Sequence, residues 1–263
     1  MKLMRKTLIL TLILITLTLT ACGGSNRSSV VVAGSTSVQP YVEFLVEEYE
    51  RIYPDTHIEV QGGGSAVGKN AVETGVADIG MMSRALKENE QHLHSIEIAR
   101  DGLAIIVHPL NPITNLTREQ IRQIYSAEIT NWSEVGGLDR QIHVMAREEG
   151  SGTRGQFTDL VMDKTRITPK AIVQNSNGAI RQLVAYDRDS IGFISLGLVD
   201  STVKAVAIDG VPASYDNVRN ETYSLFRPFL FLVNEPDEAT NHFIEFVLSP
   251  KGKELLTSEG LIP

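Results

Sequence analysis

Short apolar runs alternate with segments of helical periodicity along most of the chain. Runs rich in β-branched residues and bounded by Gly, Pro or polar residues predict strands. The strand-like runs are residues 30–33, 57–61, 104–108, 142–146, 191–195 and 229–233. Apolar residues at helical spacing predict helices that include 38–52 and 156–162. Strands that alternate with helices in this way indicate an α/β architecture.

Capping signals locate three of the expected helix starts. A threonine with a glutamine three residues later, at 117–120 and again at 153–156, fits a capping box. Ser249 followed by Pro250 fits an N-cap with proline at the first helical position. We therefore expect helices to begin at these three places.

The first 21 residues have the layout of a secretory signal, with basic residues at 2, 5 and 6 and an apolar run over 8–19. That run is shorter than the ~20 residues that span a bilayer. The sequence LTAC at 19–22 resembles the lipobox of bacterial lipoproteins, which is cleaved before the cysteine. Cys22 is then the lipidated residue, and 22–29 is a flexible polar tether. The alternative is a chance cleavage site with a free thiol.

Charge and cysteine content narrow the function classes. The chain carries 24 Lys and Arg against 32 Asp and Glu, a net charge of −8, and loss of the signal makes it more acidic. Nucleic-acid binding is thereby disfavoured. An anionic ligand would have to be attracted by local dipoles rather than by the overall field. The single cysteine excludes an intramolecular disulfide.

Three loops rich in glycine and hydroxyl residues follow strand-like runs and open helices: GSTS at 34–37, GGGSAVG at 62–68 and REEGSGT at 147–153. A helix start offers unpaired backbone N–H groups and a partial positive charge. Serine and threonine add uncharged donors, and glycine permits close approach to a ligand. Each loop alone fits a plain N-cap, but together the loops predict one shared site for a tetrahedral oxyanion.

Arg147 makes the third loop the most specific of them. A guanidinium fork can bind two oxyanion oxygens while the following backbone and hydroxyl groups bind the others. We expect Glu149 to hold Arg147 in position; the alternative for Glu149 is an exposed ion pair.

Other chemistry has weaker support. Residues 63–69 match the spacing of a nucleotide-binding loop, but Asn70 stands where a Ser or Thr would bind magnesium. His92 and His94 lie in an acidic, helix-like stretch at a spacing that suits no metal site, so surface positions are expected. A Gly-x-Ser-x-Gly elbow is absent from the sequence. Neither a metal, a cofactor nor catalysis is expected.

Six motifs together carry a family resemblance. They are GSTS at 34–37, GGS at 63–65, ADIG at 77–80, IY at 124–125 with NW at 131–132, REEGSGT at 147–153 and SIGF at 190–193. In this order and spacing the mature chain resembles the phosphate-binding proteins of bacterial ABC phosphate transporters. The resemblance implies a two-lobed periplasmic-binding-protein fold of type II-like topology, with two crossover strands and the ligand in the interlobe cleft.

The resemblance also divides the chain. It implies a first lobe of residues 30–108 plus 229–263 and a second lobe of 109–228. The sequence pattern alone is equally consistent with one larger sheet. The residues implied to bind phosphate are Thr36, Ser37, Ser65, Ser83, Arg147, Ser151, Gly152 and Thr153.

Ser83 is a departure from the family pattern. Relatives often hold an aspartate after the Gly80 segment that accepts the proton of phosphate, and here Ser83 stands there, followed by Arg84. The serine can accept or donate a hydrogen bond. The identity of the proton acceptor is therefore open at this point.

The implied function is that of a monomeric, lipid-anchored, extracytoplasmic receptor that passes inorganic phosphate to an ABC transporter permease. The alternatives are a receptor for sulfate, molybdate or tungstate, a surface signalling or adhesion protein that keeps the fold, and a secreted phosphatase or phosphotransferase.

Overall fold

The computed structural model describes residues 28–263, so the expected signal segment and Cys22 lie outside the described residues. The first strand, β1 (Ser28–Gly34), begins with Ser28 and Ser29, which pair with Thr56 and His57. The tether expected over 22–29 is therefore wrong at its last two residues, because their backbones already belong to the sheet. Within the described range no helix has the length and apolarity needed to cross a membrane.

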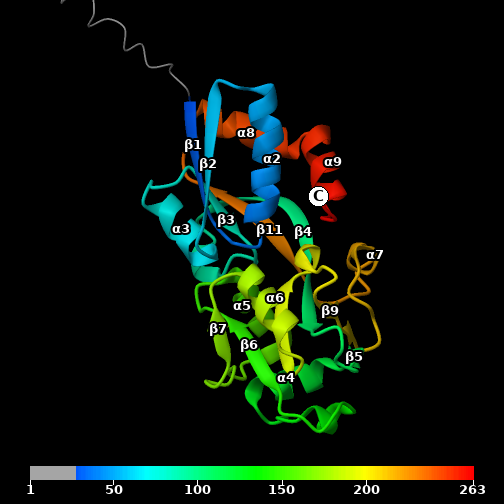
Figure 1. Ribbon diagram of the computed structural model, residues 1–263. Coiled ribbons are helices and arrows are strands. Elements are labelled where there is room, and N and C mark those ends of the chain that lie inside the picture. Colours follow the sequence, from blue (N-terminus) through cyan, green and yellow to red (C-terminus); the bar gives the residue numbers. More distant parts are fainter. Residues whose placement is uncertain (1–27) are drawn as a thin grey trace, which may run out of the picture.

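The helices and strands follow one another as an α/β chain (Figure 1). After β1 come α2 (Gln39–Ile52), β2 (Thr56–Gly62), α3 (Ser65–Glu73), β3 (Ile79–Met82) and β4 (His94–Val107). The middle holds β5 (Asn115–Leu116), α4 (Arg118–Ser126), β6 (His143–Arg147), α5 (Gly152–Phe157), β7 (Ile172–Gln174), α6 (Asn177–Tyr186), β8 (Ser190–Ser195), β9 (Lys204–Ala205), β10 (Ala207–Ile208) and α7 (Tyr215–Arg219). The chain ends with β11 (Phe226–Val233), α8 (Glu238–Leu248) and α9 (Pro250–Ser258).

One mixed sheet runs through both halves of the molecule. Its order is β2-β1-β3-β11-β4-β8-β6-β7, with β9 also paired to β4. Strands β1, β2 and β3 are mutually parallel, whereas β11 is antiparallel to both β3 and β4. The adjacent strands β4 and β11 are therefore the connection between the two halves.

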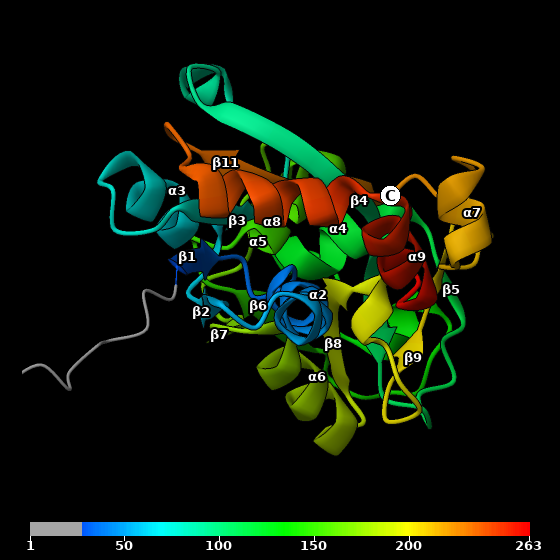
Figure 2. The same cartoon turned by 90° about the horizontal axis from the view of Figure 1, so that it is seen from above.

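Two large hydrophobic cores define a first and a second lobe, and a small third cluster packs α3 against β3 and β11 of the first lobe. In the first core Tyr49 of α2 packs edge-on against Phe243 of α8, with ring centroids 5.2 Å apart. Figures 1 and 2 show α2, α8 and α9 together on this lobe. In the second core Phe157 of α5 stacks on Phe193 of β8 at 4.2 Å. Each core buries the apolar faces of its own helices against its own part of the sheet.

The change from one core to the other occurs inside the two connecting strands. On β4, Ala99 belongs to the first core and Leu103 to the second. On β11, Phe229 belongs to the first core, and Leu225 just before the strand belongs to the second. The domain limits expected from the sequence stay a prediction, but residues 103–107 pack with the second lobe and not with the first.

Every strand-like run of the sequence overlaps a strand of the structure, namely β1, β2, β4, β6, β8 or β11, although His108 and Ile142 lie just outside β4 and β6. The helix over 38–52 is confirmed as α2, and the caps at Thr117 and Ser249 are confirmed by their hydrogen bonds to the N–H groups of Gln120 and Gly252. Strand β3 was missed because four buried residues in succession show no period.

The helix start expected at 153–156 is wrong. Helix α5 begins at Gly152, and the hydroxyl of Ser151 is the cap, accepting the N–H of Arg154 at 3.2 Å. A π-helical turn, Thr158–Met162, follows α5. The Thr153 hydroxyl is turned away from the backbone and into the interface between the lobes, where other side chains bind it.

Candidate anion site

The loop after β1 lies at the meeting of the two lobes. Gly34 ends the strand with φ of 137°, and a Cβ there would lie 2.9 Å from Gly68 Cα and also overlap Met81. Glycine is therefore required both for this backbone conformation and for the close approach of α3 and β3. The residues that follow, Ser35 and Ser37, are buried beneath the opposite lobe.

Three serines of the first lobe form one hydrogen-bonded group without any charge. Ser35 Oγ donates to Ser83 Oγ at 2.8 Å, and Ser65 Oγ accepts the N–H of Ser83 at 3.1 Å. All three side chains are buried. They come from the β1 loop, the start of α3 and the end of β3, so the fold brings together loops that are distant in sequence.

The second lobe meets these serines with the start of α5. A Cβ on Gly152 would overlap Ser65 Oγ and lie 2.7 Å from Ser83 Oγ. The N–H of Ala66 also donates to the carbonyl of Gly150 at 3.1 Å, directly between the lobes. The structure thus has the lobes closed, with the positive end of α5 facing uncharged hydroxyls.

Arg147, the last residue of β6, lies in this interface with 1% of its surface exposed. Its Nη2 donates to Thr36 Oγ1 of the first lobe at 3.1 Å, and its Nε and Nη2 donate to Glu148 at 2.9 and 3.0 Å. Its Nη1 is buried and has no partner among residues 28–263. A buried charged donor without a partner costs free energy, so this atom marks a place for an anion.

The expectation that Glu149 positions Arg147 is wrong. Glu149 is 91% exposed and lies 3.4 Å from Arg154. The carboxylate of the preceding residue, Glu148, is 28% exposed and binds the guanidinium edge. The reason is geometric: Glu149 lies in the turn before Ser151 and projects into solvent, whereas Glu148 follows β6 directly.

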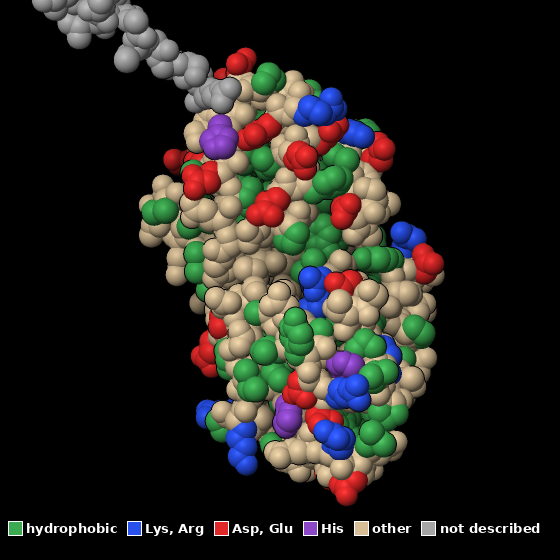
Figure 3. Space-filling model, in the orientation of Figure 1, with side chains coloured by type: hydrophobic (Ala, Val, Ile, Leu, Met, Phe, Trp, Pro, Cys, Tyr) green, Lys and Arg blue, Asp and Glu red, His purple; other side chains and the backbone are tan. Residues whose placement is uncertain are grey.

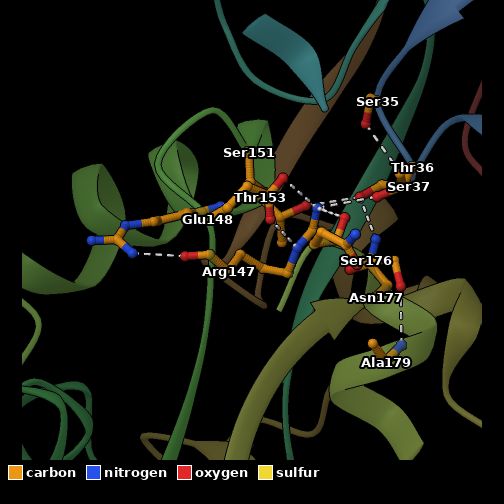
Figure 4. Close-up of polar contacts among 12 residues, drawn as sticks. Ser35, Thr36, Ser37, Arg147, Glu148, Ser151, Thr153, Ser176, Asn177 and Ala179 are labelled. Atoms are coloured by element: carbon orange, nitrogen blue, oxygen red, sulfur yellow. Dashed lines mark hydrogen bonds and ion pairs between the residues drawn. The ribbon is translucent and has the colours of Figure 1, made fainter. Parts of the chain in front are cut away.

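A second contact across the cleft joins Ser37 and Thr153, whose hydroxyl oxygens lie 2.8 Å apart. Asn177 Nδ2 donates to Ser37 Oγ at 2.8 Å (Figure 4). Asn177 is the first residue of α6 and is 1% exposed. The sequence analysis missed it, although Ser176, which caps this helix by accepting the Ala179 N–H, was a signal for another helix start.

Arg227 is a second buried cation that the sequence analysis missed. It lies on β11 opposite Asp101 of β4, and the two form a fully buried ion pair with Nη2 to Oδ2 at 2.9 Å. Arg227 Nη1 also donates to Thr153 Oγ1 at 2.7 Å. Burial raises the pKa of Asp101, and the adjacent Arg227 opposes that shift. No local motif pointed to this pair, because strand pairing alone brings it together.

The other sequence signals lie away from this interface. His92 and His94 are exposed, as expected, and His94 begins β4. Lys69 of the nucleotide-loop-like segment pairs with Glu73 on the surface of α3 at 2.6 Å. Within 28–263 no cluster of His, Cys, Asp and Glu could hold a metal ion. The waist between the lobes shows mainly uncharged surface in Figure 3, with acidic side chains spread over the first lobe above it.

The structure brings together Thr36, Ser37, Ser65, Ser83, Arg147, Gly152 and Thr153 of the residues that the resemblance implied, places Ser151 next to Gly152 as the cap of α5, and adds Ser35, Glu148, Asn177 and Arg227. Two α/β lobes, joined by two adjacent strands and facing each other through polar loops at helix starts, define the class of two-lobed binding proteins.

Comparisons with known proteins give the family. The family model described as PBP superfamily domain matches residues 20–251. Phosphate-binding protein PstS of Pseudomonas aeruginosa is 30% identical over 90% of this chain and 83% of its own length, and PstS of Borreliella burgdorferi is 29% identical over 98% and 99%. The chain therefore belongs to the PBP superfamily and, within it, to the family of bacterial phosphate-binding proteins.

Solved structures agree with this assignment. A substrate-binding protein assigned to a phosphate ABC transporter of Clostridium perfringens, solved with bound phosphate, is 42% identical and superposes with a TM-score of 0.87 over 89% of this chain and 99% of its own. An ABC-type phosphate transport receptor from Vibrio cholerae is 43% identical with a TM-score of 0.75 over the same shares. The two-lobed fold expected from the sequence is confirmed.

Proposed function

We propose that this chain captures inorganic phosphate between its two lobes and delivers it to an ABC importer. The observation that carries this proposal is the unpartnered Nη1 of Arg147, buried where hydroxyls of both lobes converge. Membership of the phosphate-binding family supports phosphate as the ion. The role is binding and transfer to a transporter, and not catalysis.

The donors at the interface suit a tetrahedral oxyanion. Arg147 supplies a charged N–H, α5 supplies the backbone N–H groups of its first turn, and the serines and threonines supply neutral hydroxyls. Several charge-assisted hydrogen bonds at ~1.5–3 kcal/mol each, less the cost of ordering, are enough for a Kd near ~1 μM. The residues named for binding stay predictions until a bound ion is observed.

We expect the two lobes to close on the ion by a hinge motion, because the hydrogen-bond donors belong to both lobes. Thr36, Ser37 and Ser65 belong to the first lobe, whereas Arg147 and Thr153 belong to the second. An ion bound to both sets stabilises the closed form relative to an open one. We expect β4 and β11 near Asp101 and Arg227 to serve as the hinge, because within residues 28–263 these two strands carry the chain from one core to the other.

The ion is identified by titrating the protein calorimetrically with phosphate, sulfate and molybdate. We expect phosphate to bind with a Kd near or below ~1 μM and the other two at least tenfold more weakly. Tighter binding of sulfate or molybdate would favour a receptor for that ion. Binding of none of them would favour a signalling or adhesion protein that keeps the fold.

The proposed cellular location depends on the sequence of residues 1–27. A signal segment over 1–21 and a lipid on Cys22 would place the folded body outside the cytoplasm as an anchored monomer next to the permease. Cys22→Ser should release the protein from membranes and leave its phosphate affinity unchanged. Continued fractionation with membranes would show that Cys22 is not the anchor.

A further inference from the structure

Arg227 contacts four groups at once in the strand pair that joins the lobes. Its Nε and Nη2 both donate to Asp101 Oδ2, at 3.1 and 2.9 Å, and its Nη1 donates to Thr153 Oγ1 at 2.7 Å and to the Ser83 carbonyl at 3.4 Å. Its guanidinium carbon also lies 5.3 Å from the centroid of the Phe229 ring. The side chain is fully buried, so its fork is fixed in place on every side.

The direction of the hydrogen bonds around Thr153 follows from which groups can only donate. A guanidinium has no acceptor, so Thr153 Oγ1 must accept from Arg227. The Nδ2 of Asn177 also only donates, so Ser37 Oγ must accept from it. The amide of Asn177 is held in this orientation because its Oδ1 accepts the N–H of Ser195 at 3.3 Å.

Ser37 and Thr153 therefore each accept from the protein and each keep one hydroxyl hydrogen. Their oxygens lie 2.8 Å apart, so one of these hydrogens joins the pair. The other hydrogen is left to be donated outside the pair. The hydroxyl that accepts within the pair accepts twice, which uses both of its lone pairs, so its own hydrogen is free to be donated to an ion in the cleft.

We propose that Arg227 is a positioning residue of the anion site, which acts through Thr153 to make the Thr153–Ser37 pair a hydrogen donor to the bound oxyanion. This inference rests on the proposed phosphate-binding function. Arg227 is anchored to Asp101 on the neighbouring strand, so it fixes Thr153 relative to the hinge while Thr153 meets the first lobe through Ser37. Arg227 itself is a support for the donors and does not contact the ion.

A double-mutant cycle on phosphate affinity tests this. Arg227→Lys keeps the charge beside Asp101, but one ammonium cannot reproduce the fork that also reaches Thr153. We expect Arg227→Lys to weaken phosphate binding about tenfold in the parent protein. In a Thr153→Val background, where the hydroxyl is absent, Arg227→Lys should weaken binding less than twofold, because interacting residues are not additive.

Thr153→Ser provides the conservative background. It restores the hydroxyl, so Arg227→Lys should again weaken binding about tenfold there. A tenfold loss in both the Val and Ser backgrounds would overturn the inference, since Arg227 would then act without the hydroxyl of Thr153. An unchanged affinity of Arg227→Lys in the parent would overturn it as well.

The control is Arg140→Lys, which makes the same exchange at an ion pair away from the site. Arg140 Nε lies 2.7 Å from Asp189 Oδ1 on the surface of the second lobe. The phosphate affinity of this variant should equal that of the parent. The melting temperature without phosphate checks that each variant folds. Should Arg227→Lys not fold, the double replacement Arg227→Met with Asp101→Leu removes the pair as a unit, and the same cycle with Thr153→Val is measured.

The two proposals fail differently. A parent protein that does not bind phosphate would overturn the proposed function. A parent that binds phosphate while the effects of residues 227 and 153 are additive would overturn only the role of Arg227.

Discussion

The first-lobe face of the cleft presents hydroxyls and a single buried cation beside α5, Arg84, which Glu90 neutralises at 2.6 Å. The second-lobe face presents Arg147 and the start of α5. Ser35, Ser65 and Ser83 bind one another, so their geometry exists without a partner from the other lobe. Arg147 is held by Glu148 of its own lobe but keeps a buried Nη1 without a partner among the described residues. The attraction for an anion is therefore concentrated on one face, and the other face serves mainly to complete closure.

The largest effect should come from preventing the two faces from meeting. Gly152→Ala adds a methyl group that would overlap Ser65 Oγ, so we expect the lobes not to close and phosphate affinity to fall about a hundredfold, or ~2.7 kcal/mol. The matched control is Gly150→Ala, whose Cβ would meet only Ala66 Cβ, at 3.5 Å. The phosphate affinities of both variants are measured by calorimetry. Equal affinities of Gly152→Ala and Gly150→Ala would contradict binding in the closed form.

Removing the charge of the second face should have the next largest effect. Arg147→Ala should weaken phosphate binding at least tenfold, ~1.4 kcal/mol, because it deletes the only unpartnered charged donor found at the interface within residues 28–263. The thermal unfolding of the ligand-free protein should show that the fold survives. A phosphate affinity equal to that of the parent would show that Arg147 does not bind the ion.

Placing a negative charge on the first-lobe face should alter selectivity more than affinity. Ser83 is fully buried and its oxygen accepts from Ser35, so it offers a weaker proton acceptor than a carboxylate. Ser83→Asp should raise the ratio of phosphate to sulfate affinity about fivefold, since sulfate has no proton to donate to the new acceptor. Ser83→Asn is the control for size. If Ser83→Asp leaves the ratio unchanged, residue 83 does not contact the protonated oxygen.

The smallest effect separates the two neighbouring glutamates. Glu148→Gln should weaken phosphate binding about threefold, because the ion pair that orients Arg147 is partly exposed and contributes less than ~1 kcal/mol. Glu149→Gln should leave the affinity as it is, since that side chain projects into solvent. If calorimetry shows a larger loss of affinity for Glu149→Gln than for Glu148→Gln, Glu149 and not Glu148 positions Arg147.

Much of the fold could be predicted from patterns that lie within a short stretch of sequence. The β-branched runs, the Thr117 cap and the hydroxyl-rich loops could be assigned because each depends on neighbours within a few residues. The start of α5 could not be assigned in this way, because Ser151 and Thr153 are both good N-cap residues. The tertiary structure decides between them, since Arg227 binds the Thr153 hydroxyl and leaves Ser151 as the cap. The choice between Glu148 and Glu149 failed for the same reason, since it depends on which side of the turn faces Arg147.

The sequence by itself determined the α/β order, the glycine- and hydroxyl-rich loops at helix starts and the cation Arg147, because these follow from local backbone preferences and residue chemistry. The tertiary structure alone decided that Asn177 binds Ser37 and that Arg227 joins Asp101 to Thr153. Residues 101 and 227 are 126 positions apart, and 153 and 227 are 74 apart. Only the antiparallel pairing of β4 with β11 and the closure of the second lobe bring such residues within hydrogen-bond distance, and no local pattern encodes either.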